Sequence, residues 1–532
     1  TIRPEDLSFE NFDGFRNFLQ DKLNWSIREV SKKSLTYEFL PEELKIDGKQ
    51  LNRLSADTIY QLIPFIRYQP WGIFLLELND PKVYITFLRQ ILRGLVPSRR
   101  KSSILPTWEV ENLLFICTYN YKDFTFAHFK GEKYQKAKLS TFNWTFGETR
   151  LRTLCEFNLP SLFYDEEFQD NHQKWLTEWS KAFDKERLTQ EFFEAYKSAL
   201  KFIKGILSAQ NKSSLQEVHS FAQQLLSRIM FLYFVEKKGW LKWKDYVQDK
   251  KYIWKLWLKY KKYKTHEDTF YSLWLSSLFF QAFNKKHGYF NFDLPDEIKE
   301  SFDLMPYLNG GLFTENELDK IGFSLPDKVF ELLFEIDPYD KRKGLLERYN
   351  FTIREDTPLD VEVAVDPEML GKVYESLISE EERGKAGIFY TPRTEIDYMC
   401  RLSLVEHLFE ETEVSKEELI SLIFEPEKIL KCEDETNLKQ MRRALDKVRV
   451  VDPAVGSASF LVGMMNVLVD IHRNLSSKID QREENLFALK NKVISENLYG
   501  VDVKDWAVMV GELRLWLSLV IDTDEKELLK MG

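Results

Sequence analysis

Cysteine is scarce in this sequence, and so are segments that could act as signal peptides or membrane spans. The 532 residues include only four cysteines, and none of these stand in short paired spacings. This pattern excludes a disulfide-stapled fold and a zinc ribbon, and it fits a reducing cytoplasm. The opening Thr1–Asp6 is too polar for a secretory segment, and charges interrupt the longest apolar runs. We therefore expect a cytoplasmic protein that does not enter a membrane. The cysteines are Cys117, Cys155, Cys400 and Cys432.

Low-complexity linkers and internal repeats are also absent from the sequence. The length predicts roughly three or four domains, because one core rarely grows to this size. Apolar periodicity predicts a mixed α/β region over 1–165, a helical region over 166–350, and alternating helices and strands over 351–532. Strands are expected at 72–78, 112–118 and 123–129, and helices at 83–95 and, almost entirely apolar, at 221–236.

The net charge of −10 argues mildly against nucleic-acid binding, but one segment of the chain is strongly basic. Residues 237–264 hold eleven lysines, two aspartates and eight tryptophans or tyrosines. A basic, aromatic surface could grip phosphates and stack on bases. Amphipathic helices are a commoner source of such spacing, so we favour a helix with Trp254 and Trp257 in the core and solvated lysines.

The stretch Val450–Phe460, VVDPAVGSASF, predicts a strand that turns tightly into a helix. Pro453 cannot continue a central strand, and the small residues that follow let a ligand approach the backbone. Asp452 stands at the carboxyl end of the strand, where α/β folds bind their ligands. A second unit of this kind, LYGVDV, ends at Asp502 and leads into another helix. Either acid could instead cap the helix after it, but together they favour a nucleoside ligand.

Two cofactors compete for this loop. NAD requires a loop with several glycines for its pyrophosphate, and here Gly456 stands alone between Ala454 and Ala458. S-adenosylmethionine has no pyrophosphate, so the loop favours a methyltransferase.

Three ordered segments resemble the motifs of gamma-class, amino-type DNA adenine methyltransferases. They are Gly387–Arg393 (GIFYTPR), VVDPAVGSASFL from Val450, and LYGVDV from Leu498. Segments at 225–240, 307–313 and 366–375 resemble parts of type IIG restriction–modification enzymes, which join a nuclease-like head, a helical connector, a methyltransferase and a target-recognition domain.

The resemblance implies a multidomain α/β fold and adenine-N6 methylation of double-stranded DNA at a specific site. It implies an α/β nuclease-like head at 1–165, a connector at 166–350, and the first half of a Rossmann-like methyltransferase domain at 351–532. Residues 389–392 would cover the methionine end of S-adenosylmethionine, the 452 loop would form the floor, and Asp502 would accept from the ribose. The implied cofactor residues are Phe389, Tyr390, Thr391, Pro392, Asp452, Pro453, Ala454, Gly456, Ser457, Asp502 and Val503.

The sequence departs from this family in three ways. Val455 replaces a cysteine, and Ala458 replaces a glycine and adds a methyl group where the cofactor approaches. The family also needs Asn or Asp, then Pro-Pro and an aromatic, to hold a flipped base, and no Pro-Pro occurs here. We therefore assign no catalytic residues and expect the N-terminal part of a longer enzyme, inactive alone. A protein that binds the cofactor without catalysis, or a DNA-binding scaffold that uses 237–264, stays open.

A nuclease head of the PD-(D/E)xK type would need two acids and a lysine to hold Mg²⁺. The best candidates are Glu77, with Asn79 in place of the lysine, and either Asp57 or Asp47 as the earlier acid. A glutamate near the end of a strand more often has no catalytic role, so the head is expected to be degenerate. Mg²⁺ is expected only if it is active, and the sequence predicts no oligomeric state.

Overall fold

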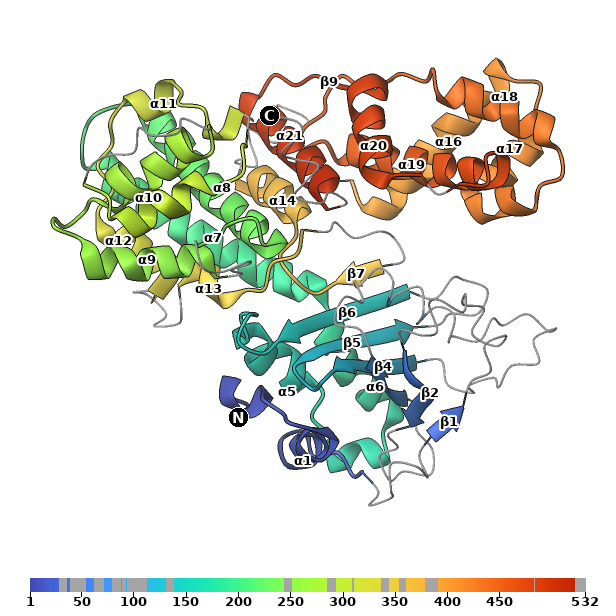
Figure 1. The fold of residues 1–532 in the computed structure, drawn as a ribbon, viewed down its shortest axis with the longest axis horizontal. Helices are drawn as coiled ribbons and strands as arrows, with labels where there is room; N and C mark the ends of the chain where they lie inside the picture. Colours follow the sequence, from blue (N-terminus) through green and yellow to red (C-terminus); the bar gives the residue numbers. More distant parts are fainter. Residues whose placement is uncertain are drawn as a thin grey trace. The chain divides into compact units, whose positions relative to one another are not determined.

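The computed structural model describes residues 1–27, 36–38, 54–61, 71–78, 88, 92, 112–130, 138–243, 251–284, 293–308, 311–335, 344–353, 360–377, 391–482 and 484–521. These residues form a helix-rich α/β protein (Figure 1). The chain divides into two compact units. Unit 1 comprises 1–192, 343–350 and 359–365, and unit 2 comprises 193–342, 351–358 and 366–532.

Unit 1 is built on a mixed sheet of seven strands in the order β1 to β7 (Figure 1). Neighbouring strands are antiparallel except for the parallel pairs β3–β4 and β6–β7. The last strand comes from far along the chain, because Asp360 pairs with Leu139 of β6. The strands are β1 Thr36–Glu38, β2 Leu54–Gln61, β3 Trp71–Leu78, β4 Asn112–Tyr119, β5 Asp123–Lys130, β6 Lys138–Thr145 and β7 Asp360–Glu362.

Aromatic side chains attach helices to this sheet. Phe124 of β5 lies 4.8 Å, between ring centroids, from Phe15 of α1 (Phe12–Leu23). Trp71 of β3 lies 5.5 Å from Trp179 of α6 (His172–Ser180). The strands expected at 72–78, 112–118 and 123–129 are confirmed as β3, β4 and β5. The helix expected at 83–95 lies outside the described residues apart from Leu88 and Leu92.

Unit 2 is centred on α8 (Leu215–Lys238), which is buried along nearly its whole length after Val218. This confirms the helix expected at 221–236. Ser214 and Glu217 form a capping box at its start, and Gly239 ends it in the left-handed conformation. The other helices of this half are α9 Tyr252–Tyr263, α10 Asp296–Asp303, α11 Glu317–Lys320 and α12 Asp327–Phe330, and α7 Lys185–Ser208 runs from unit 1 into unit 2.

A buried ion pair joins α8 to the segment after Gly311. The guanidinium of Arg228 binds both carboxylate oxygens of Asp319, at 2.6 and 2.9 Å. Its Nε also donates to the carbonyl oxygen of Leu312 at 2.6 Å. Both side chains are at most 3% exposed, so the pair fixes the position of residues 312–319 against α8.

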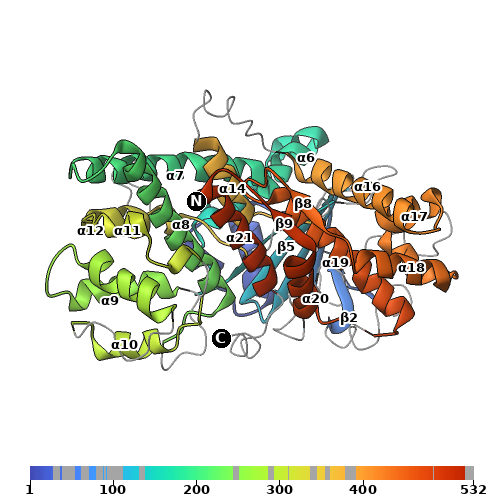
Figure 2. The same ribbon diagram turned by 90° about the horizontal axis from the view of Figure 1, so that it is seen from above.

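The C-terminal part of unit 2 packs helices around two short parallel strands, β8 (Val450–Asp452) and β9 (Leu498–Gly500). Helix α19 lies beside both strands (Figure 2). Leu498 is buried in the same apolar cluster as α19, whereas Val451 and Tyr499 on the other face are exposed. The helices here are α14 Pro367–Leu377, α16 Arg393–Glu411, α17 Lys416–Phe424, α18 Glu435–Leu445, α19 Ser459–Ile479, α20 Leu486–Lys492 and α21 Asp505–Val520. Among the helices that the structure describes, none combines the length and apolar character needed to cross a membrane.

We predict that Arg228→Met destabilises the protein by about 3–5 kcal/mol, because the carboxylate of Asp319 is left buried without its partner. The double variant Arg228→Met with Asp319→Leu should recover part of this loss. Lys320→Met, which removes an exposed ion pair with Glu317, is the control and should change stability by less than about 1 kcal/mol. Urea unfolding followed by tryptophan fluorescence measures all three. Equal effects of the buried and exposed substitutions would contradict the prediction.

Candidate functional site

The two acidic turns predicted from the sequence lie side by side in unit 2. β8 and β9 are paired in parallel, with Asp452 opposite Gly500. The turns after them exchange backbone hydrogen bonds, from the Val501 amide to the Asp452 carbonyl and from the Val455 amide to the Val501 carbonyl, both at 2.9 Å. The turns at the carboxyl ends of β8 and β9 therefore lie against each other, and we call these two turns together the rim.

The carboxylates of Asp452 and Asp502 both accept hydrogen bonds from backbone amides of the rim. Asp452 accepts from the amide of Ala454 at 3.1 Å. Asp502 reaches across to accept from the amide of Gly456 at 2.9 Å, and its other oxygen accepts from the amide of Lys504, also at 2.9 Å. A carboxylate has about four acceptor positions, so Asp502 can still accept from a ligand.

The turn after β8 has an unusual backbone. Gly456 and Ala458 both have positive φ, at 49° and 62°. Ala458 carries a Cβ into the left-handed region, which costs on the order of 1 kcal/mol. Its methyl group is buried, and a Cβ built on Gly511 of α21 would lie 2.9 Å from it. The methyl of Ala458 therefore faces α21 and not the open side of the turn, contrary to our expectation that it meets the cofactor.

The other turn residues divide into buried and exposed positions. Val455 is buried beside Gly500 and Leu461, so its side chain points into the core as expected. Pro453 and Ala454 are exposed, and so is Val503, at 91%.

Ser457 is buried and is bound by the side chain of Arg514. It is 3% exposed, and Nη1 of Arg514 on α21 donates to its carbonyl oxygen at 2.6 Å and its hydroxyl oxygen at 3.1 Å. The same nitrogen donates to the hydroxyl of Ser459 at 2.9 Å. The side chain of Ser457 is thus engaged by the protein.

Helix α14 links this turn to the start of α16. Asp366 caps α14 by accepting from the amide of Met369 at 3.1 Å. Arg393, the residue after Pro392, pairs with Asp366 at 3.2 Å and also with Glu368. One turn further along α14, Gly371 faces Ser457. Of the expected residues before Arg393, Thr391 is half-buried and Pro392 is exposed, while Phe389 and Tyr390 lie outside the described residues.

The charges around Glu368 determine its ionisation. Burial raises the pKa of this carboxyl, but Arg393 and Lys372, with a smaller contribution from Arg514, more than offset that effect. The net pKa lies well below its usual range. The ionised Glu368 carboxylate therefore stabilises the folded protein. This stabilisation is fully present above the ordinary pKa of 4.5 and is lost as the pH falls below it.

The nuclease candidates of unit 1 lie on neighbouring strands. Asp57 is in β2, within the stretch where the register between β2 and β3 shifts, and Glu77 is in β3. The hydroxyl of Tyr121 donates to the carboxylate of Glu77. Asn79 and the alternative acid Asp47 lie outside the described residues. Among the residues that the structure describes, no three His, Cys, Asp or Glu side chains are grouped to hold a metal ion.

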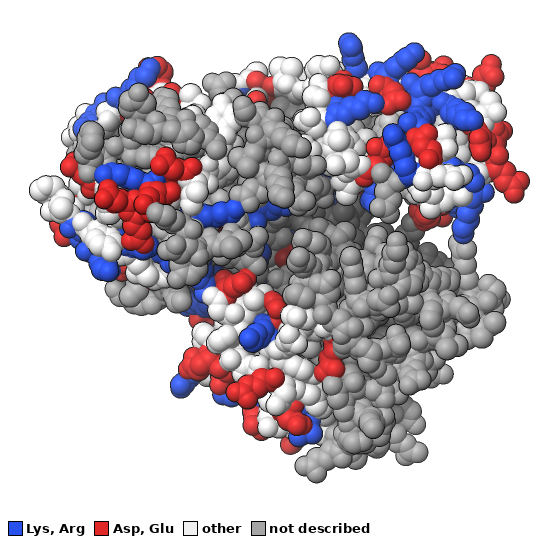
Figure 3. Space-filling model, in the orientation of Figure 1, with Lys and Arg blue, Asp and Glu red and all other residues white. Residues whose placement is uncertain are grey.

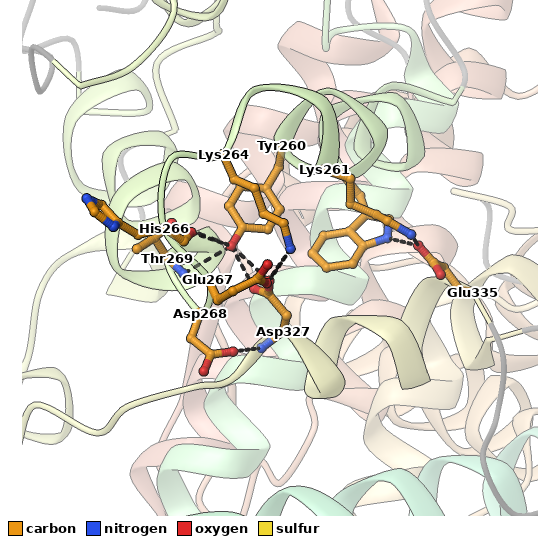
Figure 4. Close-up of polar contacts among 10 residues, drawn as sticks. Tyr260, Lys261, Lys264, His266, Glu267, Asp268, Thr269, Asp327 and Glu335 are labelled. Carbon is orange, nitrogen blue, oxygen red and sulfur yellow. Dashed lines mark hydrogen bonds and ion pairs between the residues drawn. The ribbon is translucent and has the colours of Figure 1, made fainter.

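In the described part of the lysine-rich segment, several aromatic rings are buried in unit 2. Trp257 and Tyr260 are buried, whereas Trp254 is half-buried. The Tyr260 hydroxyl donates to Asp327 at 2.8 Å, as Figure 4 shows.

Three lysines of this segment pair with acids. Lys261 binds Glu335 at 2.7 Å, Lys264 binds Asp327 at 3.2 Å, and Lys259 pairs with Glu297. The buried rings cannot stack on bases, so the structure agrees with the amphipathic-helix interpretation.

Sequence reasoning missed the contacts that support the turn. Gly371 lies within a segment that we had compared with known enzymes, but no local pattern assigns a partner to it, to Arg514 or to Gly511. Each acts on a residue far away in the chain.

Comparisons with known proteins show what the part of the chain with the two turns is similar to. Residues 429–526 match a family model described as the DNA-methyltransferase domain of MmeI. A Methanocaldococcus jannaschii protein, whose name describes a type II restriction enzyme and methyltransferase, is 27% identical over 458 residues, or 72% of this chain and 36% of that protein. DNA methyltransferase A of Bacillus subtilis is 24% identical over 226 residues, or 42% of this chain and 21% of that protein. The chain thus spans only about a third or less of these curated relatives.

A solved structure also matches: the type IIL restriction–modification enzyme MmeI in complex with DNA. The match has 16% sequence identity and a TM-score of 0.38, and it covers 64% of this chain and 37% of that one.

We predict that Gly511→Ala destabilises the protein by about 1–2 kcal/mol, because the new Cβ meets the methyl of Ala458 at 2.9 Å. In an Ala458→Gly background the same change should be neutral or stabilising, because alanine is a better helix former than glycine. The coupling energy of the cycle, measured by denaturant unfolding, should be about 1 kcal/mol or more.

Gly205→Ala in α7 is the matched control, since nothing lies within 4 Å of a Cβ built there. It should not destabilise the protein. Additive effects of the substitutions at 458 and 511 would show that these two residues do not touch.

Proposed function

The chain belongs to the restriction–modification DNA methyltransferases, and from this premise we propose that the turns after β8 and β9 bind S-adenosylmethionine. We propose further that the enzyme transfers the methyl group to N6 of adenine at a specific site in double-stranded DNA. In this proposal residues 351–532 are the first half of a Rossmann-like domain, preceded by the connector 166–350 and the nuclease-like head 1–165.

The observation that carries the cofactor assignment is the use of the amides in the turn after β8. Pyrophosphate binding at such a turn requires backbone N–H groups that point at the phosphates. Here four amides donate to oxygens of the protein itself, two of them to carboxylates. They are the amides of Ala454, Val455, Gly456 and Ala458. This leaves little for a dinucleotide to bind.

The charge of the rim supports the same choice. Asp452 and Asp502 bring two carboxylates to one rim, which repels a pyrophosphate. The sulfonium of S-adenosylmethionine is a cation and is attracted instead. We propose that Asp502 accepts a hydrogen bond from the ribose and that the turn Asp452–Ser457 forms the floor of the site. Phe389, Tyr390, Thr391 and Pro392 would cover the methionine end, and Val503 would lie beside the nucleoside.

Methyl transfer to an amino group also needs acceptors for the amino hydrogens and an aromatic ring that stacks on the flipped base. The family supplies these from a motif with Pro-Pro, which the printed sequence does not contain. We therefore propose cofactor binding for this chain and assign no catalytic residue to it.

We predict that the chain binds S-adenosylmethionine in calorimetric titration and gives no comparable heat with NAD. Asp502→Ala should weaken binding by about tenfold or more, because it removes a carboxylate hydrogen bond worth about 1.5–3 kcal/mol. Glu496→Gln is the control, because Glu496 is an exposed acid that precedes β9, at the opposite end of the strand from Asp502. A preference for NAD, or equal affinities of wild type and Asp502→Ala, would refute the assignment.

The alternative of a DNA-binding scaffold depends on the segment 237–264. Its buried rings and paired lysines do not favour that role. On the face in Figure 3, basic and acidic side chains of described residues are also interspersed over α16–α18.

We predict that replacing Lys255, Lys261 and Lys262 by methionine changes DNA affinity by less than about threefold in a salt titration. A large loss of affinity, with a smaller salt dependence, would instead establish the scaffold function. Asp502→Ala, measured alongside, should leave DNA affinity unchanged.

A further inference from the structure

Arg514 is a buried cation that acts on the proposed cofactor turn from behind. It is 2% exposed, on α21, and one of its nitrogens donates to three oxygens of the turn and of the first residue of α19. A guanidinium loses its hydration when it is buried, so an apolar side chain would pack α21 at lower cost. The three oxygens on Ser457 and Ser459, together with the nearby carboxylate of Glu368, account for a charged residue at this position.

Ser457 is also confined by α14. A Cβ built on Gly371 would lie 2.5 Å from the hydroxyl oxygen of Ser457 and 2.7 Å from its Cβ. The backbone of α14 therefore approaches as closely as a glycine permits. The same Cβ would lie 3.5 Å from Nη1 of Arg514, so the backbone of α14, the Ser457 hydroxyl and the Arg514 guanidinium are packed together at one point. Ser457 has little room to rotate there.

The turn requires such support because its backbone is not the preferred one. Gly456 and Ala458, on either side of Ser457, both adopt left-handed conformations. Strained residues persist where the surrounding structure over-determines them, and they concentrate at ligand-binding sites. Asp502 holds the amide of Gly456 from the β9 side, and Arg514 holds Ser457 from the α21 side.

We infer that Arg514 is a positioning residue that holds the turn Asp452–Ser459 in its ligand-binding conformation, with Gly371 packed closely against the same serine. This inference rests on the proposed function for the identity of the ligand. Arg514 does not touch that ligand, because Ser457 lies between them and is itself buried. Its loss lowers the fraction of molecules in which the turn is ready to bind, and apparent affinity falls in proportion to that fraction.

The first test follows the turn without any ligand. Hydrogen exchange, read by mass spectrometry on peptides that cover 452–459, should become about tenfold faster in Arg514→Met. Arg514→Lys should lie between this variant and wild type, because an ammonium can still donate to the same oxygens. Lys490→Met is the control, since Lys490 also binds α21, through the carbonyl of Ser518 at 3.0 Å. It should leave exchange over 452–459 unchanged.

Gly371→Ala gives an independent route to the same result if Arg514→Met fails to fold. The added methyl collides with Ser457 and should also speed exchange over 452–459. Ser457→Gly in the same chain removes the colliding atoms and should restore slow exchange.

The second test is the affinity for S-adenosylmethionine in calorimetry. Arg514→Met and Gly371→Ala should weaken it by about tenfold, and Lys490→Met should leave it unchanged. Exchange that stays at the wild-type rate in both variants overturns the inference. Faster exchange without any loss of affinity overturns it as well, because the turn would then bind without support. If wild type binds no S-adenosylmethionine, the proposed function fails, and the exchange rates alone still decide whether Arg514 holds the turn.

Discussion

The hydrogen bond from the Gly456 amide to the carboxylate of Asp502 is the interaction on which the site depends. It connects two turns that meet only because β8 and β9 run in parallel. With it, the carboxylate at the end of one strand stabilises a left-handed residue after the other. The same contact takes up a backbone donor that a phosphate would otherwise use. One bond thus contributes to the shape of the turn and to the choice of ligand.

Three helices converge on this turn, and each does so at a small or buried residue. α19 begins directly after Ala458, α21 approaches it through Gly511 and Arg514, and α14 approaches it through Gly371. Close approach without side chains leaves little room for adjustment, because packed interiors contain few voids. The conformation of the turn is therefore a property of the packed unit more than of its own sequence.

This division explains what the sequence alone could predict. Val450–Phe460 and Leu498–Val503 carry local signals, namely β-branched residues, an acid and a change of period, and both strands appear where expected. The apolar run of α8 and the strands β3 to β5 were predicted for the same reason. The pairing of β7 with β6 was not, because Asp360–Glu362 has no local feature that selects a strand in unit 1. The contacts of Arg514 and Gly371 likewise join distant residues. The left-handed conformation of Ala458 was not predictable either, because that conformation usually favours glycine.

The rim is suited to a cation but poorly suited to a polyanion, and this constrains how DNA could approach. Asp452 and Asp502 lie together at the carboxyl ends of the strands, where phosphates would be repelled. Three of the lysines around Trp257 and Tyr260 are paired with acids, and these two rings are buried. Phosphate contacts that hold a duplex need lysines or arginines that can release counterions on binding. If the rim binds the cofactor as proposed, such contacts come from surfaces other than these two. The rim would then meet the cofactor and a single extruded base without meeting the backbone of the duplex.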